Sequence, residues 1–461
     1  MSSHPSRRRL AGATVLAALA LAPATATAAE RVATLPGFDE PSTPGRYDKV
    51  KVLEEGPASA KHVLVLEPGT SASAAYFRPV ALDILKRLPG WQIWSVERRE
   101  NLLEDQSVFD QAKQGKVTPQ ALFDYYLGWI GNEHGQAHFQ PKTKEQVGFA
   151  RRWGMRVAME DLHRVIASAK QGGRKVVLGG HSLGGTMTVA YATWDFAGKP
   201  GGDDLDGLVL IDGGSGPGTK RRPTPTPAQA QASVDKLATE DPFLDLTGTG
   251  LTWSAGVFNG IGSLLALRDP DGPSILGAWP LLPASLKAPV PVTNRGAYGY
   301  ALDTETGPSS LALVQQHLGH LATTGDPRGW VDGELGTVGR AAATFSGIVG
   351  LDGTAWYHPR RLSLDGSVTN GGLPTAAQKT LGVRTIHGRD LDLPIYAFET
   401  SLGKGRVLKG AELLAKQSHI AGRRLTLVDR STTYAHVDPL TAVPSKNAFL
   451  KTVVPFLKKV G

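Results

Sequence analysis

Cysteine is absent from all 461 residues of this sequence. The chain therefore has no disulfide framework, thiolate metal site, cysteine nucleophile or iron–sulfur ligand. A chain of this length can bury a sizeable core without such links, and its 41% hydrophobic and 20% charged residues are typical of a packed globule. Any catalytic chemistry is expected from serine, histidine, aspartate or glutamate side chains.

Long basic runs are also lacking, although the formal net charge is +8. Lysines and arginines lie in short, scattered groups such as Lys220–Arg222 and Arg360–Arg361. Nucleic-acid-binding proteins concentrate positive charge on one face, and no basic stripe with interleaved aromatic residues occurs here. The sequence therefore predicts no nucleic-acid partner.

The N-terminal residues 1–29 have the pattern of a secretory leader. Arg7–Arg9 precede an apolar stretch over Leu10–Ala22, and the small residues Ala24–Ala29 follow. Thirteen apolar residues are too few for a permanent span, so no stable membrane anchor is expected. The leader predicts a secreted, extracellular protein exported by the Sec or the twin-arginine route. Its removal would lower the net charge to +5.

Strand and helix patterns alternate along the rest of the chain. This alternation predicts an α/β fold with a mostly parallel central sheet and helices on both faces. The expected strands are 47–53, 62–66, 91–96, 175–178, 208–211, 394–398 and 425–428. The expected helices are 74–88, 145–170, 183–196 and 445–459.

The rhythm is interrupted between residues 213 and 392. A structureless loop of that length is implausible in a compact domain, so we expect a folded cap or lid insertion. Helix-like patterns occur around 228–240 and 309–323. The α/β core would then comprise residues 30–212 and 393–461. A large apolar cap favours a pocket for a lipophilic acyl or alcohol group.

The strongest chemical signal is the segment KVVLGGHSLGGT at residues 175–186, an apolar strand that runs through Gly-His-Ser-Leu-Gly into a helix. A G-x-S-x-G pattern in this context predicts a nucleophilic serine on a strained turn, here Ser182. Gly180 and Gly184 would avoid collisions with the neighbouring strand and helix. The backbone N–H of Leu183 would point at an oxyanion near the helix N-terminus.

Serine needs a base to accept its proton. His436 follows the apolar strand 425–428 and precedes the last helix, which is where such a base is expected. His181, inside the elbow, is expected to orient or pack rather than react.

These features resemble the α/β-hydrolase superfamily, and its lipase and esterase branches in particular. The resemblance covers residues 45–212 and 393–460, with GHSLGG as its most specific element. It implies the chain order serine, acid, histidine, and an oxyanion loop after the third strand. That loop is Glu67–Ser71, in which Thr70 or Ser71 would supply the second N–H donor. Pro68–Gly69 replaces the usual His-Gly.

The acid of the expected triad is left open between two residues. In most members of the superfamily the acid lies a few residues after the seventh strand, and Glu399, at the end of that strand, is the nearest carboxylate. Asp212 ends the preceding strand, which is an alternative position for the acid. Asp390, in His387-Gly388-Arg389-Asp390, is a third candidate that precedes the better strand.

The pattern predicts a secreted serine hydrolase that cleaves small-molecule ester or lipid substrates through an acyl-enzyme, with no cofactor and no metal. Serine at the elbow argues against epoxide hydrolases and dehalogenases of this fold, which use aspartate there. One alternative is a secreted serine aminopeptidase, which would need an acidic anchor such as Glu67 or Glu97. The other is a non-catalytic lipid-binding relative.

Overall fold

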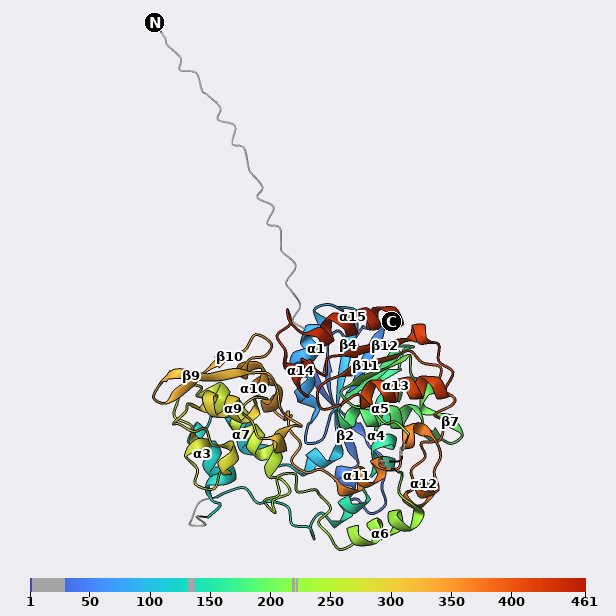
Figure 1. The fold of residues 1–461 in the computed structure, drawn as a ribbon, viewed down its shortest axis with the longest axis horizontal. Helices are drawn as coiled ribbons and strands as arrows, with labels where there is room; N and C mark the ends of the chain where they lie inside the picture. The colour runs from blue at the N-terminus through green and yellow to red at the C-terminus, as the bar shows by residue number, and fades with distance from the viewer. Residues whose placement is uncertain (2–29, 132–136, 218–219, 221–222) are drawn as a thin grey trace.

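An eight-stranded sheet forms the centre of the computed structural model, which describes residues 1, 30–131, 137–217, 220 and 223–461 (Figure 1). The expected leader lies outside the described residues. The spatial order is β1-β2-β4-β3-β5-β8-β11-β12, and β2 alone runs against the other strands. The strands are β1 (Glu30–Pro36), β2 (Lys49–Glu55), β3 (His62–Glu67), β4 (Trp91–Glu97), β5 (Lys175–His181), β8 (Gly207–Ile211), β11 (Ile395–Glu399) and β12 (Leu425–Asp429).

The predicted α/β class with a mostly parallel sheet is confirmed. All seven expected strands are present with ends shifted by a few residues. Strand β1 was not expected, because its side chains are mostly exposed and it follows directly on the leader pattern. It joins the sheet as an antiparallel edge strand on β2.

Helices cover both faces of the sheet, as the alternation of side chains along each strand requires. Val63 and Val65 of β3 belong to one core cluster, whereas Leu64 and Leu66 belong to the other. The first cluster includes α4 (Met155–Ala169), α5 (Leu183–Ala192) and α13 (Arg406–Gln417). The second includes α1 (Arg78–Leu85), α10 (Val338–Ser346), α14 (Asp438–Thr441) and α15 (Ala448–Val460).

A lobe lies beside the sheet (Figure 1). It has an aromatic core of its own. Two distant segments build it, since Phe109 and Tyr126 pack against Trp356, and Phe139 packs against Trp253. Its helical elements are α2 (Ser107–Lys113), α3 (Pro119–Phe123), a π-turn at Asp124–Gly128, α7 (Ser254–Arg268), α8 (Ile275–Ala278) and α9 (Asn294–Leu302). The connection between β4 and α4 thus contributes to the lobe, which the sequence pattern did not reveal.

Residues of the insertion 213–392 belong to more than one core cluster. Its helices α6 (Pro227–Leu237), α11 (Arg360–Gly366) and α12 (Ala376–Leu381) contribute to the sheet-side cluster of α4 and α5. The helix expected over 309–323 is wrong. Only Ser309–Leu311 forms a 3₁₀ turn, and β9 (Gly319–Gly325) pairs with β10 (Arg328–Asp332) as a hairpin. Pairing between these two segments overrides the local helical spacing.

The remaining elements are short. A small hairpin joins β6 (Asp195–Phe196) to β7 (Lys199–Pro200). The other 3₁₀ turns are Gly45–Tyr47, Ala74–Phe77, Arg99–Leu103, Gly148–Arg152, Gly201–Asp204, Ala284–Leu286, Asn370–Gly372 and Gly422–Arg424. Within the described ranges, no helix combines the length and hydropathy needed to cross a bilayer.

Candidate active site

Ser182 occupies a sharp turn between β5 and α5. Its backbone has φ 57° and ψ −120°, a combination that a residue with a side chain adopts only under strain from its surroundings. The Ser182 N–H donates to the Ile211 carbonyl at 2.9 Å, which ties the turn to the neighbouring strand β8. The turn thus holds Ser182 at the carboxyl end of the sheet, partly exposed, at the start of a helix.

The glycines around Ser182 lie against backbone atoms that leave no room for a side chain. A Cβ on Gly184 would lie 1.9 Å from the Glu67 carbonyl oxygen, and one on Gly180 would lie 2.2 Å from the Gly184 carbonyl. Gly213 is equally constrained, since a Cβ there would lie 1.8 Å from the Ser182 carbonyl oxygen. Close backbone packing therefore dictates the pattern that the sequence displays.

Gly184→Ala should destabilise the protein by about 3 kcal/mol, because the methyl group meets main-chain atoms that cannot move aside cheaply. Gly90→Ala is the matched control, since no atom lies within 4 Å of its added Cβ, and its effect should stay within about 0.5 kcal/mol. Urea denaturation of both variants measures the difference. Equal unfolding midpoints would show that the elbow tolerates a side chain.

His436 and Asp212 are brought together at the same end of the sheet. The Nδ1 of His436 lies 2.5 Å from Oδ2 of Asp212, and both side chains are buried. Thr400 donates its N–H to the Oδ1 of Asp212 at 2.8 Å and its hydroxyl to the Oδ2. Burial would raise the pKa of Asp212, but the bonds to His436 and Thr400 outweigh it and hold that pKa below its usual value.

Glu399, the other acid candidate, is bonded elsewhere. One carboxylate oxygen accepts from the Leu408 N–H at 3.1 Å, in the first turn of α13. It thus serves as an acidic group at a helix N-terminus, where negative charge is favourable. Asp390 is farther from the site, since it bonds to His387 at 2.7 Å near the β6–β7 hairpin. Of the three candidates, Asp212 is the one hydrogen-bonded to His436.

His181 links the elbow to the loop that carries His436. Its Nε2 donates to the His436 carbonyl oxygen at 2.8 Å, and its Nδ1 accepts from the Tyr76 hydroxyl. The two imidazole rings lie with centroids 4.4 Å apart. Burial, and next the nearby His436, lower the pKa of His181 to about 3, so the ring is neutral and acts as a fixed hydrogen-bonding link.

The Glu67–Ser71 loop lies directly beside Ser182. A Cβ on Gly69 would lie 3.0 Å from the Ser182 Cβ, so the loop backbone and the serine are in contact. Ser71 has a positive φ of 56°, and both its hydroxyl and its carbonyl bond to Ala355. These bonds engage Ser71 with the segment that leads out of the lobe.

The His436 loop is also fastened to the lobe, through Asp438. This buried carboxylate accepts from the Ala435 N–H and the His317 N–H, and it lies 2.5 Å from Nδ1 of His317. The hydrogen bond to Asp438 raises the pKa of the half-buried His317, with Asp303 and Glu305 adding to the effect. The hydrogen-bonded pair of His317 and Asp438 connects the two parts of the molecule.

The stabilisation from His317 should depend on pH. A histidine whose folded pKa is raised contributes stability that is complete below its unfolded pKa of about 6.5 and is lost as the pH rises through the folded pKa. His317→Gln should therefore lower the Tm more at pH 5 than at pH 9. His320→Gln, at an exposed histidine nearby, controls for charge on this segment. A Tm difference that is the same at both pH values would contradict the pairing.

Sequence reasoning did not find Thr400, Tyr76 or His317 as parts of this site. Thr400 follows an expected strand and Tyr76 lies within an expected helix, but their roles depend on neighbours 188 and 105 residues away in the chain. His317 was expected on a cap helix. No local pattern marks such long-range partners.

The strand order with a single reversed strand, and a serine elbow after β5, define the α/β-hydrolase fold. The predicted resemblance to this superfamily is thereby confirmed at the level of the fold.

Neither a protein-family model nor a curated protein matches the chain. Solved structures similar to it include a Sulfolobus solfataricus protein with a provisional assignment as a lipase, at 16% identity and TM-score 0.48, covering 94% of this chain and 95% of that one. Epoxide hydrolase A of Mycobacterium thermoresistibile has 14% identity, TM-score 0.41 and coverages of 94% and 98%. A soluble variant of monoglyceride lipase from Saccharomyces cerevisiae has 12% identity and a TM-score of 0.36, and the match covers 89% of this chain and 92% of that one. The class assignment rests on the strand order and the elbow.

Proposed function

We propose that the chain is a secreted serine hydrolase that cleaves carboxylic esters. The observation that carries this proposal is the 2.5 Å contact between His436 and Asp212, at the end of the sheet where the strained Ser182 emerges. A buried, oriented histidine beside an elbow serine is the arrangement that activates a hydroxyl for attack on a carbonyl.

The first half of the reaction forms an acyl-enzyme. His436 uses Nε2, the ring nitrogen that does not face Asp212, to take the Ser182 proton as Oγ bonds to the ester carbon. The carbonyl π electrons move onto oxygen, which the N–H group of Leu183 and that of Thr70 or Ser71 stabilise. When the oxyanion reforms the carbonyl, the alkoxide leaves with the proton from His436. Asp212 stabilises the imidazolium throughout.

Water completes the cycle. His436 takes a proton from water as the water oxygen bonds to the acyl carbon. The second tetrahedral intermediate then breaks to release the carboxylic acid. The Ser182 oxygen recovers its proton from His436 in this step. The acyl group is thus transferred from alcohol to water with no change in oxidation state, so the cycle needs no redox cofactor.

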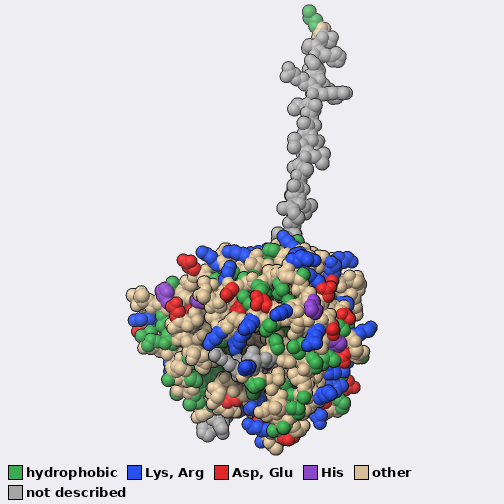
Figure 2. Space-filling model, turned by 45° about the vertical axis from the view of Figure 1, so that its right-hand side comes forward, with side chains coloured by type: hydrophobic (Ala, Val, Ile, Leu, Met, Phe, Trp, Pro, Cys, Tyr) green, Lys and Arg blue, Asp and Glu red, His purple; other side chains and the backbone are tan. Residues whose placement is uncertain are grey.

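A small-molecule ester or lipid is the proposed substrate. Lys and Arg side chains lie interspersed with acidic and neutral ones on the face in Figure 2, which offers no continuous basic field for a polyanion. The aminopeptidase alternative loses the acids named for it, because Glu67 and Glu97 are both buried and Glu97 accepts the Ala74 N–H. Export remains part of the proposal, and N-terminal sequencing of protein from the medium tests cleavage near residue 29.

The experiment combines p-nitrophenyl esters of rising acyl length with aminoacyl-p-nitroanilides. We expect ester turnover that is abolished by a fluorophosphonate, with the label mapped to Ser182. Turnover of the anilides alone would instead favour the peptidase. If the protein shows no turnover and no labelling, the non-catalytic lipid-binding relative would be favoured.

A further inference from the structure

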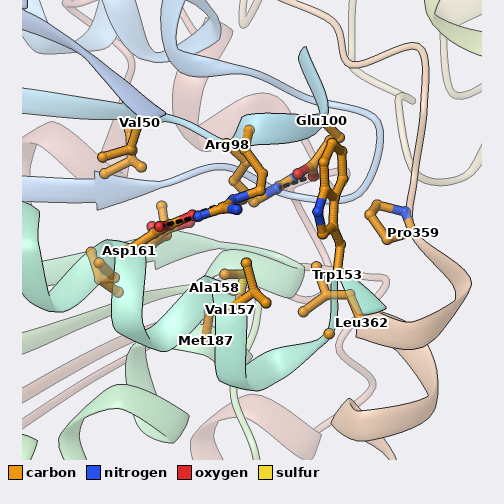
Figure 3. A pocket seen from close by; sticks show the side chains of 15 residues that line it. Val50, Arg98, Glu100, Trp153, Val157, Ala158, Asp161, Met187, Pro359 and Leu362 are labelled. Carbon is orange, nitrogen blue, oxygen red and sulfur yellow. Dashed lines mark hydrogen bonds and ion pairs between the residues drawn. The ribbon is translucent and has the colours of Figure 1, made fainter. Parts of the chain in front are cut away.

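Arg98 is a buried cation whose side chain forms hydrogen bonds to the loop beside Ser182. It follows β4 directly and is 5% exposed. Its Nη1 donates to the Pro68 carbonyl at 2.8 Å, and its Nη2 donates to the carbonyls of Gly69 and Ala72 at 3.0 and 3.4 Å. Nε donates to Glu100 at 2.7 Å (Figure 3). One guanidinium therefore binds three backbone carbonyls of a single turn.

The bond to Gly69 also fixes the direction of a backbone N–H group. A peptide unit is planar and trans, so its C=O and N–H bonds point in opposite directions. The Gly69 carbonyl and the Thr70 N–H belong to the same peptide unit. Because Arg98 holds that carbonyl, the Thr70 N–H must point away from Arg98. A Cβ on Gly69 would lie 3.0 Å from the Ser182 Cβ, so the backbone on which this N–H lies passes close to the serine.

We infer that Arg98 is a positioning residue of the oxyanion hole, which holds and polarises the Gly69–Thr70 peptide so that the Thr70 N–H stabilises the oxyanion formed at Ser182. The inference rests on the proposed serine hydrolase function. A cation bonded to the carbonyl end of a peptide draws electron density from its N–H, which strengthens the donor at the other end. Arg98 thereby assigns the second donor to Thr70 rather than Ser71.

The charges around Arg98 leave its positive field acting on the loop. The guanidinium has one close ion-pair partner, Glu100, whereas the nearest oxygen of Glu67 is 4.0 Å away. Burial raises the pKa of Glu67 to about 8, although Arg98 opposes the shift, so this carboxyl is largely protonated at neutral pH. Arg98 and Glu67 line a cavity of about 20 Å³ together with Trp153 and Met187. Figure 3 labels Arg98, Trp153 and Met187 around it.

Arg99 shows that burial alone does not explain the contacts of Arg98. It is also buried, but it forms a two-pronged pair with Asp161 at 2.6 and 2.8 Å and a second bond to Asp48 at 2.9 Å. It ties α4 to the chain between β1 and β2, and none of its hydrogen bonds reaches residues 67–72. Arg99→Lys is therefore a matched control, with a similar loss of buried contacts away from the oxyanion loop.

The test compares Arg98→Lys and the double variant Arg98→Met/Glu100→Gln with wild type and Arg99→Lys. The double variant removes the clamp without leaving Glu100 as an unpaired buried charge. Each protein is titrated with a fluorophosphonate to count reactive sites. We then measure kcat and KM for an ester, and the affinity for a trifluoromethyl ketone, whose carbonyl carbon bonds to the serine oxygen while its own oxygen becomes an oxyanion.

The double variant should lose about 100-fold in kcat with KM changed less than about threefold, as for removal of one oxyanion donor. Ketone affinity should fall in parallel, and Arg98→Lys should lie between, because an ammonium cannot span the carbonyls as a planar fork does. Arg99→Lys should lower the Tm but leave kcat close to that of wild type.

A double variant that is folded and keeps the wild-type kcat and ketone affinity would overturn the role of Arg98. An equally large loss of kcat in Arg99→Lys would also overturn it. Failure of the proposed function is a separate outcome, because wild type itself would then neither turn over esters nor react with the fluorophosphonate.

Discussion

Replacement of Ser182 by alanine should lower kcat for ester hydrolysis by about 10⁶-fold, the scale seen when a serine nucleophile is removed from an intact triad. The elbow backbone should persist, because its strain is imposed by neighbouring strands and by close glycine contacts rather than by the serine hydroxyl. Ester hydrolysis by single-turnover and steady-state kinetics measures the loss, and circular dichroism confirms the fold.

Thr186→Ala is the matched control for Ser182→Ala. Its hydroxyl lies one turn further along α5 and donates to the Gly214 carbonyl at 3.2 Å. Losing this one hydrogen bond should cost about 1 kcal/mol of stability and leave kcat within a factor of a few. If Ser182→Ala kept substantial turnover while Thr186→Ala did not, the nucleophile would have been misassigned.

Local pattern was sufficient to predict Ser182 and His436 as candidate site residues because each lies in a short segment with a recognisable sequence. The serine turn needs glycines at fixed offsets, since backbone atoms lie 2.2 Å from where the Cβ of Gly180 would be and 1.9 Å from where that of Gly184 would be. His436 is marked by its place between the last strand and the closing helices. Both features are readable within about ten residues of sequence.

The acid could not be chosen from the sequence for a topological reason. Strands β8 and β11 are neighbours, and Ile211 pairs with Phe398, so the next residues, Asp212 and Glu399, end their strands at the same level. Either could face the histidine. What separates them is conformation: Asp212 turns at a positive φ of 43° toward Thr400 and His436, whereas Glu399 continues toward α13.

The lobe was partly hidden for a related reason. Phe109 and Tyr126 come before α4, whereas Trp356 lies within the insertion 213–392, and their packing is not encoded in any local periodicity. In the same way, β9 exists because β10 pairs with it, although its own sequence has helical spacing. Non-local contacts thus decided the elements that the sequence pattern missed or predicted wrongly.

Asp212→Asn should lower kcat by about 10⁴-fold while leaving the site geometry in place. The Thr400 N–H donates to Oδ1 of Asp212, so the amide oxygen of an asparagine would stay there and its NH₂ group would face Nδ1 of His436. His436 would then have to accept at Nδ1 and carry its proton on Nε2. In that tautomer it cannot take a proton from Ser182.

Glu399→Gln is the matched comparison, since it makes the same change of a buried carboxylate to an amide on the adjacent strand. It should leave kcat close to that of wild type and cost about 0.5 to 1 kcal/mol of stability, because Glu399 provides the negative charge at the start of α13. Kinetics and urea denaturation of both variants measure the two effects. A large kcat loss in Glu399→Gln with little change in Asp212→Asn would reverse the assignment of the acid. A small effect on kcat in both variants would exclude both carboxylates as the acid.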